Sequence, residues 1–352
     1  MTLSVNIAKI ISVAIHANMM LAGYTAAVLV ATKNVRCIKN MRPNCLIRTI
    51  NLPREDWLAA RRLGIGGSDA SVVVGINKWK SPVALWLEKT GQVAEPDLSD
   101  NETIYWGNVL EDVVAAEFAR RTGLKVRRRN AVFQHPKYPF MLANIDRDIV
   151  GKNDGLECKT ANAFAKADWD GENVPDSYFL QVQHYCAVMG YDGMYIAVLI
   201  GGQQFVHKYI PRDEEVINVL IEAEKAFWQH VIDKTMPAID GSEASAEALK
   251  RLYPVGNGQV VNLPDTAELW LTQYEKAKAD EEEAKSRKQE AQNVLCQMLG
   301  DSEIGIVGER KVEWKTVAGR KTFDAKKFEK DHPALYGQYV KIGESSRRFA
   351  VK

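Results

Sequence analysis

The sequence lacks the features that most quickly assign a chain to a class. It has no marked charge of either sign, since 46 Lys and Arg against 45 Asp and Glu give a formal net charge of +1. Its five cysteines are odd in number and include no CxxC pair, so neither a disulfide framework nor a zinc site is expected. It also lacks internal repeats and long low-complexity tracts. What remains is an ordinary globular composition, long enough for one large domain or two smaller ones.

A neutral total charge does not exclude a nucleic-acid partner, because a basic groove can coexist with it. Three local basic runs are present, at Arg61–Arg62, Arg120–Arg121 and Arg127–Arg129. Each run taken alone is more typical of a solvated surface, so charge by itself does not predict the partner.

The N-terminal stretch Ile10–Thr32 contains no Lys, Arg, Asp or Glu. Its length would suit a membrane span or a signal peptide, but His16 and Asn18 make it only moderately apolar. We interpret residues 1–50 as a peripheral segment and expect no stable membrane partner, with a membrane anchor kept as an alternative.

The periodicity of the central region alternates between helix and strand. Apolar residues at helical spacing predict an amphipathic helix over 103–122, built on Trp106, Val109, Leu110, Val113, Val114 and Phe118. Strands are expected at 124–133, 141–150, 156–160, 193–200 and 204–210, with further helices ending at Met189 and spanning 214–234. This order predicts an α/β (α+β) fold with a central mixed β-sheet flanked by helices, in a domain over residues 51–239.

The C-terminal region differs in composition, and we place a boundary within 240–259. Residues 260–352 are predicted to form an extension with one long charged helix, 267–299, and a few short strands. That helix has two interpretations, a coiled-coil arm or a helix packed on its own chain through Leu269, Leu271, Leu295 and Leu299. The second is favoured, because a Lys/Glu block interrupts the apolar heptad.

Two carboxylates and one ammonium are the candidate catalytic groups. Residues two apart on a strand share a face, so Glu157 and Lys159 project together, and a hairpin turning at 151–155 brings Asp146 beside them. Carboxylates bind hard divalent cations, which assist phosphodiester hydrolysis. A lysine there can orient or deprotonate the attacking water, or stabilise the transition state. This D-x₁₀-E-x-K spacing alone is also compatible with an ordinary charged surface hairpin.

Other polar residues are placed to assist. Glu111 lies beside the apolar stripe of its helix, and Gln181 and Gln183 follow on the next one, although exposed helix surface is the commoner role for each. The glycine-rich segment 64–68 offers backbone N–H groups to an anion, and Arg61 and Ser68 would suit a terminal phosphate. Alternatively this loop merely turns the chain, with Ser68 or Asp69 capping a helix.

The ordered set of motifs resembles the YqaJ-type viral recombinase family, which is related to the exonuclease of phage lambda and belongs to the PD-(D/E)xK nucleases. The likeness spans about residues 50–235. It is carried by Trp57-x₃-Arg61, Gly64–Asp69, Trp106-Gly107-x₃-Glu111, Asp146, Glu157-Cys158-Lys159 and Gln181-Val182-Gln183.

The resemblance implies a restriction-endonuclease-like core and a 5′→3′ exonuclease acting on double-stranded DNA ends in the bacterial cytoplasm. It implies Mg²⁺, for which Mn²⁺ would substitute, a single-strand annealing protein as partner, and a homo-oligomer, a trimer in some relatives. The residues implied as metal ligands are Asp146, Glu157 and the backbone carbonyl of Cys158, with Glu111 in support. Lys159 would act on the attacking water, Gln181 and Gln183 would line the site, and Arg61 and Ser68 would hold the 5′ phosphate.

The sequence departs from the family pattern beside Asp146. Ile145 stands in place of the proline that names the motif, and Arg147 in place of a common glycine. Arg147 and Asp148 are expected either to pair with each other or to alter the local field. An endonuclease or nickase on the same fold, and a catalytically silent DNA-binding scaffold, are the alternative functions.

Overall fold

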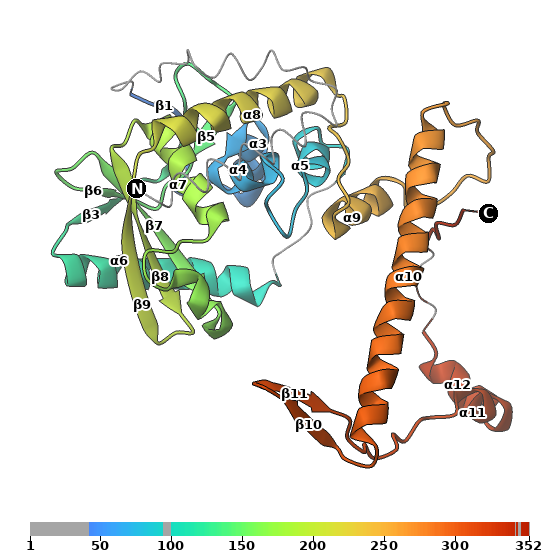
Figure 1. The fold of residues 1–352 in the computed structure, drawn as a ribbon. Coiled ribbons are helices and arrows are strands. Elements are labelled where there is room, and N and C mark those ends of the chain that lie inside the picture. The colour runs from blue at the N-terminus through green and yellow to red at the C-terminus, as the bar shows by residue number, and fades with distance from the viewer. Residues whose placement is uncertain (1–41, 94–99, 342, 344–345, 352) are drawn as a thin grey trace. The chain divides into compact units, whose positions relative to one another are not determined.

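The computed structural model describes residues 42–93, 100–341, 343 and 346–351, and the chain divides into two compact units, Met1–Tyr253 and Pro254–Lys352 (Figure 1). The apolar stretch Ile10–Thr32 lies outside the described residues. Among the helices that are described, none combines the length and apolar character needed to cross a membrane. The domain boundaries given above stay predictions.

A five-stranded mixed sheet forms the centre of the first unit, in the order β3-β6-β7-β8-β9. β6 pairs with β7 antiparallel, β7 with β8 parallel, and β8 with β9 antiparallel. This confirms the predicted mixed α/β class. The strands are β3 (Val126–Arg128), β6 (Arg147–Ile149), β7 (Asp154–Ala161), β8 (Gly193–Ile200) and β9 (Gln204–Pro211).

A second sheet holds four short strands in the order β1-β4-β5-β2. Two strands expected to be continuous are divided between the two sheets, 124–133 into β3 and β4, and 141–150 into β5 and β6. The expectation was wrong there because the chain bends between Ala143 and Arg147 and again after Arg128. The strands are β1 (Asn44–Arg48), β2 (Ile65–Gly66), β4 (Ala131–Gln134) and β5 (Met141–Ala143). β1 lies within the segment expected to be peripheral, yet it pairs with β4.

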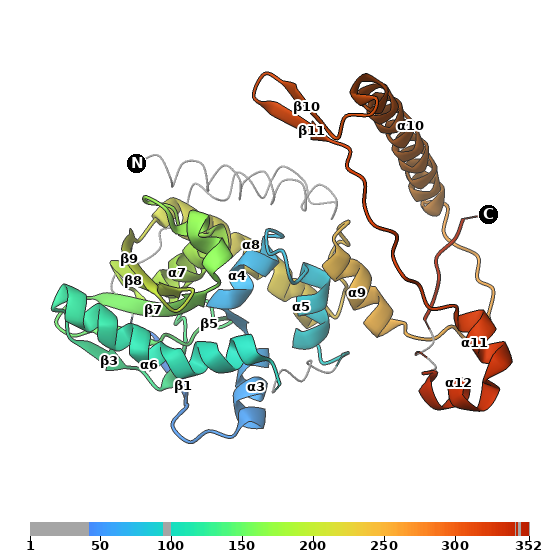
Figure 2. The same cartoon turned by 90° about the horizontal axis from the view of Figure 1, so that it is seen from below.

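Helices cover both faces of the central sheet, as Figures 1 and 2 show. The alternation along β8 explains this arrangement, since Ala197 packs in the cluster of α6 (Glu102–Thr122) while Ile196 and Val198 pack with α7 (Asp176–Met189) and α8 (Glu214–Asp233). Such burial of both faces accounts for the nearly continuous apolar run of β8.

The expected apolar face of α6 is only partly covered. Val114 and Phe118 are buried, whereas Trp106 is 50% exposed and Val109 and Val113 are also exposed. The N-terminal half of α6 therefore presents apolar side chains at the surface, although its helical spacing was correctly predicted.

A smaller core joins the remaining helices of the first unit. Trp86 and Leu87 pack with Phe227 of α8 and Ala248 of α9. Ser81 caps α5 by accepting a hydrogen bond from the N–H of Ala84, and Pro82 follows at the first helical position. These helices are α3 (Arg54–Arg62), α4 (Gly67–Val73), α5 (Pro82–Lys89) and α9 (Glu243–Leu252), and the 3₁₀ segment η2 (Ala163–Trp169) follows β7.

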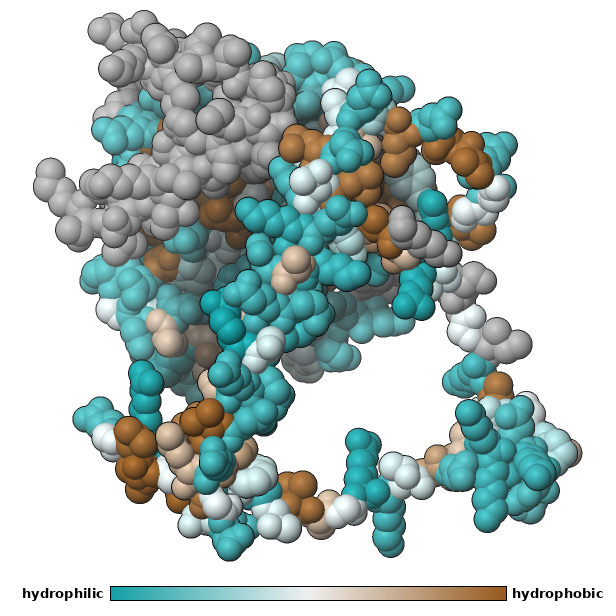
Figure 3. Space-filling model, turned by 45° about the vertical axis from the view of Figure 1, so that its right-hand side comes forward, coloured by the Kyte–Doolittle hydropathy of each residue, from teal (hydrophilic) through white to brown (hydrophobic). Residues whose placement is uncertain are grey.

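The second unit has little core of its own. None of its helices contains a buried residue, and Leu269 and Leu295, expected to pack α10 onto the chain, are 60% and 41% exposed. Hydrophobic side chains of this kind are visible as brown patches among hydrophilic ones in Figure 3. Its elements are α10 (Ala267–Leu299), β10 (Ile304–Val307), β11 (Arg310–Glu313), α11 (Ala325–Asp331) and α12 (Pro333–Tyr339).

Candidate active site

Asp146 lies in the bend that separates β5 from β6, directly before the first residue of β6. Its Oδ2 atom accepts a hydrogen bond of 2.7 Å from the backbone N–H of Cys158 on β7. The pairing of Arg147 with Leu156 and of Asp148 with Gly155 sets this register. The hairpin thus brings Asp146 beside the Glu157–Lys159 segment.

Glu157 and Lys159 project together from β7 and form a close ion pair. The Nζ atom of Lys159 lies 2.6 Å from Oε1 of Glu157, and the two side chains are 18% and 6% exposed. Gln181 on α7 completes the cluster, because its Oε1 accepts from Lys159 at 3.1 Å and its Nε2 donates to Glu157 at 2.7 Å. The Lys159 ammonium also lies 4.8 Å from the ring centre of Tyr178. Both ends of the Gln181 amide are therefore used, which fixes its orientation.

The cluster holds more negative charge than its own residues neutralise. The Oε2 atom of Glu157 is buried, with no hydrogen-bond partner among the described residues. Burial, followed by the charges of Glu157 and Glu111, raises the pKa of Asp146 well above its usual value. Buried carboxylates crowded in this way lower their free energy by taking up a proton or a cation.

Lys159 is a cation in this environment. Burial by itself would lower the pKa of its ammonium, but the adjacent Glu157 and Asp146 carboxylates outweigh that effect and raise the pKa. A lysine with a raised pKa is a poor proton acceptor, so the geometry favours a role in orienting water and stabilising charge over general-base catalysis.

Cys158 lies between these two residues and contributes its backbone N–H to Asp146. Burial raises the pKa of its thiol, with further contributions from Asp146 and Glu157. The side chain therefore stays a neutral thiol, a weak metal ligand compared with a thiolate. Any contribution of Cys158 to a metal site comes from its backbone.

Glu111 is engaged by arginines. Arg147, whose side chain is 5% exposed, donates to Glu111 Oε1 at 2.6 Å, to Asp112 Oδ1 at 2.6 Å and to the carbonyl of Asp146 at 2.7 Å. Arg128 Nη2 lies 3.6 Å from the same Glu111 oxygen. Glu111 thus faces the cluster closely enough to raise the pKa of Asp146, while its own charge is balanced from β3 and β6.

Arg147 and Asp148 do not pair with each other, so the first of the two alternatives expected for them is wrong. Neighbouring residues on a strand point to opposite faces, and Asp148 instead accepts from Arg127 at 2.9 Å and from Tyr191 at 2.5 Å. Arg147 therefore acts on the site, whereas Asp148 belongs to the opposite face of the sheet.

The donor set fits a hard divalent cation that takes few ligands from the protein and keeps several water molecules. Within the ranges that the structure describes, no three His, Cys, Asp or Glu side chains converge as a preformed cage. Asp146 and Glu157 do converge, and an unpartnered buried oxygen remains on Glu157. Mg²⁺ is commonly held by one or two carboxylates, with water and substrate phosphate completing its shell, so these residues fit it.

Gln183 does not line the site, which corrects the expectation for that residue. Its Nε2 donates to the carbonyl of Pro211 at 2.9 Å, and its Oε1 accepts from the N–H of Asp213 at 2.9 Å. Residues two apart on a helix point about 200° apart, so Gln181 and Gln183 cannot face the same cluster. Gln183 instead anchors the turn between β9 and α8.

Arg61 and Ser68 come together at the start of α4, as expected. Arg61 Nη2 donates to Ser68 Oγ at 3.2 Å, and it lies 3.6 Å from Asp69 Oδ1. Asp69 is buried, receives the N–H of Gly66, and pairs with Lys89 at 2.9 Å. Burial would raise the pKa of Asp69, but Lys89 and Arg61 lower it further than burial raises it, so Asp69 is a carboxylate.

Tyr185 connects this cluster with Glu157, and no role was predicted for it from the sequence. Its hydroxyl lies 3.2 Å from Gln181 Nε2, and Gly67 packs directly against its ring. Lys89, which neutralises Asp69, was missed as well. Tyr185 follows Gln181 by four residues, a spacing that places both on one face of a helix and could have indicated their contact. The approach of Gly67 to the Tyr185 ring depends on tertiary packing alone and could not be predicted.

Gly67→Ala is expected to lower stability by about 1–3 kcal/mol, the range for overpacking a tight contact. A Cβ atom at Gly67 would clash with the Tyr185 ring, whereas one at Gly66 would meet only Asp69 Oδ2 at 3.7 Å. Gly66→Ala is therefore the matched control and should unfold at nearly the wild-type urea concentration. Equal midpoints for the two variants would contradict the assigned packing.

Sequence comparison identifies a matching family and a relative of this chain. The family model described as a YqaJ-like viral recombinase domain matches residues 56–192. A Bacillus subtilis (strain 168) protein, described as uncharacterized protein YqaJ, is 43% identical over 315 residues, covering 88% of this chain and 98% of that protein.

Two solved structures show weaker likeness. An alkaline exonuclease from Laribacter hongkongensis is 20% identical, with a TM-score of 0.45 over 51% of this chain and 94% of that one. A phage-related exonuclease from Haemophilus somnus 129PT is 14% identical, with a TM-score of 0.35 over 51% of this chain and 99% of that one. Scores this low do not establish a common fold, so the assignment depends on the sequence relatives.

Proposed function

Because this chain belongs to the YqaJ-like viral recombinase family, we propose that it is a metal-dependent DNA nuclease that resects duplex ends from 5′ to 3′. Family membership confirms the resemblance inferred from the ordered motifs. The observation that carries the proposal is the cluster of Asp146, Glu157, Lys159 and Gln181, in which a buried Glu157 oxygen has no partner among the described residues.

In this proposal Asp146 and Glu157 hold Mg²⁺, or Mn²⁺ in its place, with the backbone carbonyl of Cys158 as a further oxygen donor. The chemistry that such a cation supplies is activation of water and stabilisation of the charge that develops at phosphorus. The raised pKa of Asp146 supports this assignment, because a carboxylate penalised by burial and by like charge gains most from a cation. Glu111 supports the site through the field it exerts on Asp146.

Lys159 acts as a fixed positive charge next to the scissile phosphate. Its pairing with Glu157 and Gln181 holds the ammonium in one place, so little reorganisation is needed as negative charge develops. The Gln181 amide is hydrogen-bonded to both Lys159 and Glu157 and so holds the two side chains in fixed positions. The same amide donates to the Tyr185 hydroxyl, and the Tyr185 ring packs against Gly67 beside Ser68, so these contacts connect the carboxylates with the Arg61–Ser68 cluster.

Arg61 and Ser68 hold the 5′ phosphate of the strand being degraded. Arg61 is 37% exposed in its side chain, so its guanidinium is open to a ligand, and it lies near enough to Tyr185 to lower that hydroxyl's pKa against the opposing effect of burial. A pocket for a terminal phosphate next to the cleavage site is useful to an exonuclease and unnecessary to an endonuclease.

Family membership also supports a role in phage-type recombination within a bacterial cell. The 3′ single-stranded tail left by resection is the substrate of a single-strand annealing protein, which we propose as the partner. Assembly of the nuclease units into a homo-oligomer, such as a trimer, belongs to the same proposal.

Digestion by the purified full-length chain tests this function. Linear duplex labelled at either end, with or without a 5′ phosphate, is compared with closed circular DNA in Mg²⁺. Stepwise loss from 5′-phosphorylated ends with circles intact is expected. Cutting of circles would make the chain an endonuclease or nickase, and no cleavage with intact DNA binding would make it a silent scaffold.

Arg61→Ala is expected to reduce the preference for 5′-phosphorylated over 5′-hydroxyl ends about tenfold or more, the value of one charge-assisted hydrogen bond. Initial rates on the two substrates give the preference directly. Arg54→Ala, at the other end of α3, is the matched loss of charge and should leave the ratio unchanged. A parallel fall on both kinds of end would remove Arg61 from phosphate recognition.

A further inference from the structure

Two arginines lie directly opposite each other on neighbouring strands of the central sheet. Arg128 of β3 is the register partner of Arg147 of β6, so the two side chains project from the same face. Like charges opposite each other across two strands are destabilising unless anions neutralise them. Helix α6 supplies two carboxylates to this pair, those of Glu111 and Asp112. The four side chains, which we call the arginine network, carry no net charge.

The arginine network has a buried half and a solvated half. The side chains of Arg147 and Glu111 are 5% and 28% exposed, whereas those of Arg128 and Asp112 are 48% and 69% exposed. Ion pairs are stronger where water is excluded and weak where it is not. The pair of Arg147 with Glu111 is therefore the stronger half of the network, and it is the half next to the catalytic cluster.

One nitrogen of Arg147 bridges Glu111 and the backbone of Asp146. Its Nη1 atom donates to Glu111 Oε1 at 2.6 Å and to the carbonyl oxygen of Asp146 at 2.7 Å, while Nη2 donates to Asp112 Oδ1 at 2.6 Å. Both hydrogens of Nη1 are thus used, which holds the guanidinium in one orientation. Glu111 Oε1 therefore already has a fixed positive charge beside it, supplied by the protein itself.

Helix α6 turns Glu111 toward the strand that carries the catalytic residues. Gly107 lies four residues before Glu111 and Val114 three residues after it, so all three share one face of the helix. Val114 is buried in the cluster between α6 and the central sheet, and a Cβ atom at Gly107 would lie 3.9 Å from Thr160 Oγ1 on β7. The Glu111 carboxylate therefore lies on the side of α6 that faces the proposed cation site.

We propose that Arg147 is a positioning residue that keeps Glu111 out of the coordination shell of the catalytic cation, so that Asp146 and Glu157 are its only acidic ligands. This inference rests on the proposed function and adds the limit on the ligand set. Affinity for a hard cation rises with the number of carboxylates around it, but each carboxylate also takes a position and some of the positive charge that water and phosphate would use. Arg147 therefore weakens cation binding and favours hydrolysis.

Mn²⁺ binding by the full-length chain without DNA tests this role, because electron paramagnetic resonance measures the free ion directly. Arg147→Met removes the charge and keeps most of the side-chain volume. It should bind Mn²⁺ at least about tenfold more tightly than the wild type, since Glu111 becomes a further ligand. Adding Glu111→Gln should return the affinity to within about threefold of the wild type. Single-turnover hydrolysis at saturating Mn²⁺ should be slower in Arg147→Met despite the tighter binding.

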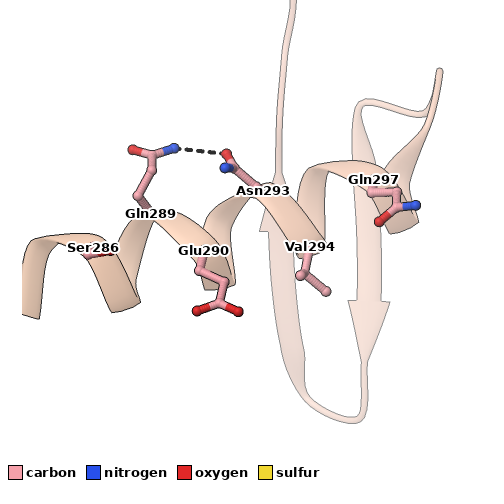
Figure 4. Close-up of a pocket in the computed structure, with 6 residues that line it drawn as sticks. All are labelled: Ser286, Gln289, Glu290, Asn293, Val294 and Gln297. Atoms are coloured by element: carbon pink, nitrogen blue, oxygen red, sulfur yellow. Dashed lines mark hydrogen bonds between the residues drawn. The ribbon is translucent and has the colours of Figure 1, made fainter. Parts of the chain in front are cut away.

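Three matched variants separate the position of Arg147 from its charge. Arg147→Lys keeps the charge and should bind Mn²⁺ as the wild type does. Arg128→Met removes the same charge from the solvated half and should tighten binding by less than about threefold. Glu290→Gln removes a carboxylate from the exposed surface of α10, where the neutral Gln289 and Asn293 lie beside it (Figure 4), and should leave the affinity unchanged. Equal tightening by Arg128→Met and Arg147→Met would overturn the assignment to Arg147.

The outcomes distinguish this inference from the proposed function. Unchanged or weaker Mn²⁺ binding in Arg147→Met would make Arg147 a merely structural residue and leave the proposed function intact. No binding by the wild type, or equally tight binding by Asp146→Asn, would overturn the cation site and the inference together. If Arg147→Met does not fold, Glu111→Gln alone decides. A fall in affinity beyond about a hundredfold, more than a residue next to the ligands contributes, would show that Glu111 is already a ligand, and a smaller fall is expected.

Discussion

Lys159→Ala is expected to slow DNA hydrolysis by about 10²–10³-fold, the loss that follows removal of one preorganised charge from a buried active site. Lys159 is bound to Glu157 and Gln181 and retains its proton, so its contribution is electrostatic and positional. DNA binding should change little, because Arg61, Ser68 and the carboxylates, to which we assign contacts with the DNA and the cation, remain.

Single-turnover rates with enzyme in excess separate this effect from binding. Lys166→Ala, an exposed lysine on η2, is the matched loss of charge and should cleave at the wild-type rate. Titration with Mg²⁺ is needed as well, since the variant leaves the Glu157 carboxylate without the Lys159 ammonium that pairs with it. Recovery of the wild-type rate at high Mg²⁺ would show that Lys159 acts only by supporting the metal site.

The local geometry of the site could be predicted because it depends on periodicity along one strand. Glu157 and Lys159 share a face by strand alternation, and the turn after Val150 determines which residues of β6 meet β7. The same reasoning, applied to a helix, would have excluded Gln183, since residues two apart on α7 diverge.

The bonding of Arg147 could not be predicted, because Glu111 and Asp112 are far away in sequence and the strand–helix contact alone brings them together. The same holds for Gly67 against Tyr185. Division of the strand expected at 141–150 escaped prediction because periodicity along the chain does not record a change of sheet. The bend sets Asp146 apart from the pleat of β6.

Asp146→Asn is expected to have two effects. It should raise the stability of the metal-free protein, and it should abolish hydrolysis. The fold raises the pKa of Asp146 above the value of about 4 that it has in the unfolded chain. At any pH above that unfolded value, ionisation of Asp146 therefore lowers the stability of the folded protein. That cost grows as pH rises from the unfolded toward the folded pKa and is absent below both. Asparagine removes it and can still accept the N–H of Cys158.

Thermal unfolding in EDTA measures the stability effect. At neutral pH the melting temperature of Asp146→Asn should exceed that of the wild type by roughly 2–4 °C, the shift that about 1 kcal/mol gives in a domain of this size. The difference should shrink toward pH 4, and Mg²⁺ should stabilise the wild type more than the variant by mass action. Wild-type hydrolysis should also fall on acidification as the Asp146 carboxylate takes up its proton.

Asp148→Asn, two residues further along the chain, is the matched control with the opposite expectation. Asp148 pairs with Arg127 and accepts from Tyr191 on the far face of the sheet, so its replacement should lower the melting temperature and leave hydrolysis intact. If instead Asp146→Asn destabilised the metal-free protein as Asp148→Asn does, Asp146 would be a structural carboxylate satisfied by its own neighbours. The cation site proposed at Asp146 and Glu157 would then have no driving force.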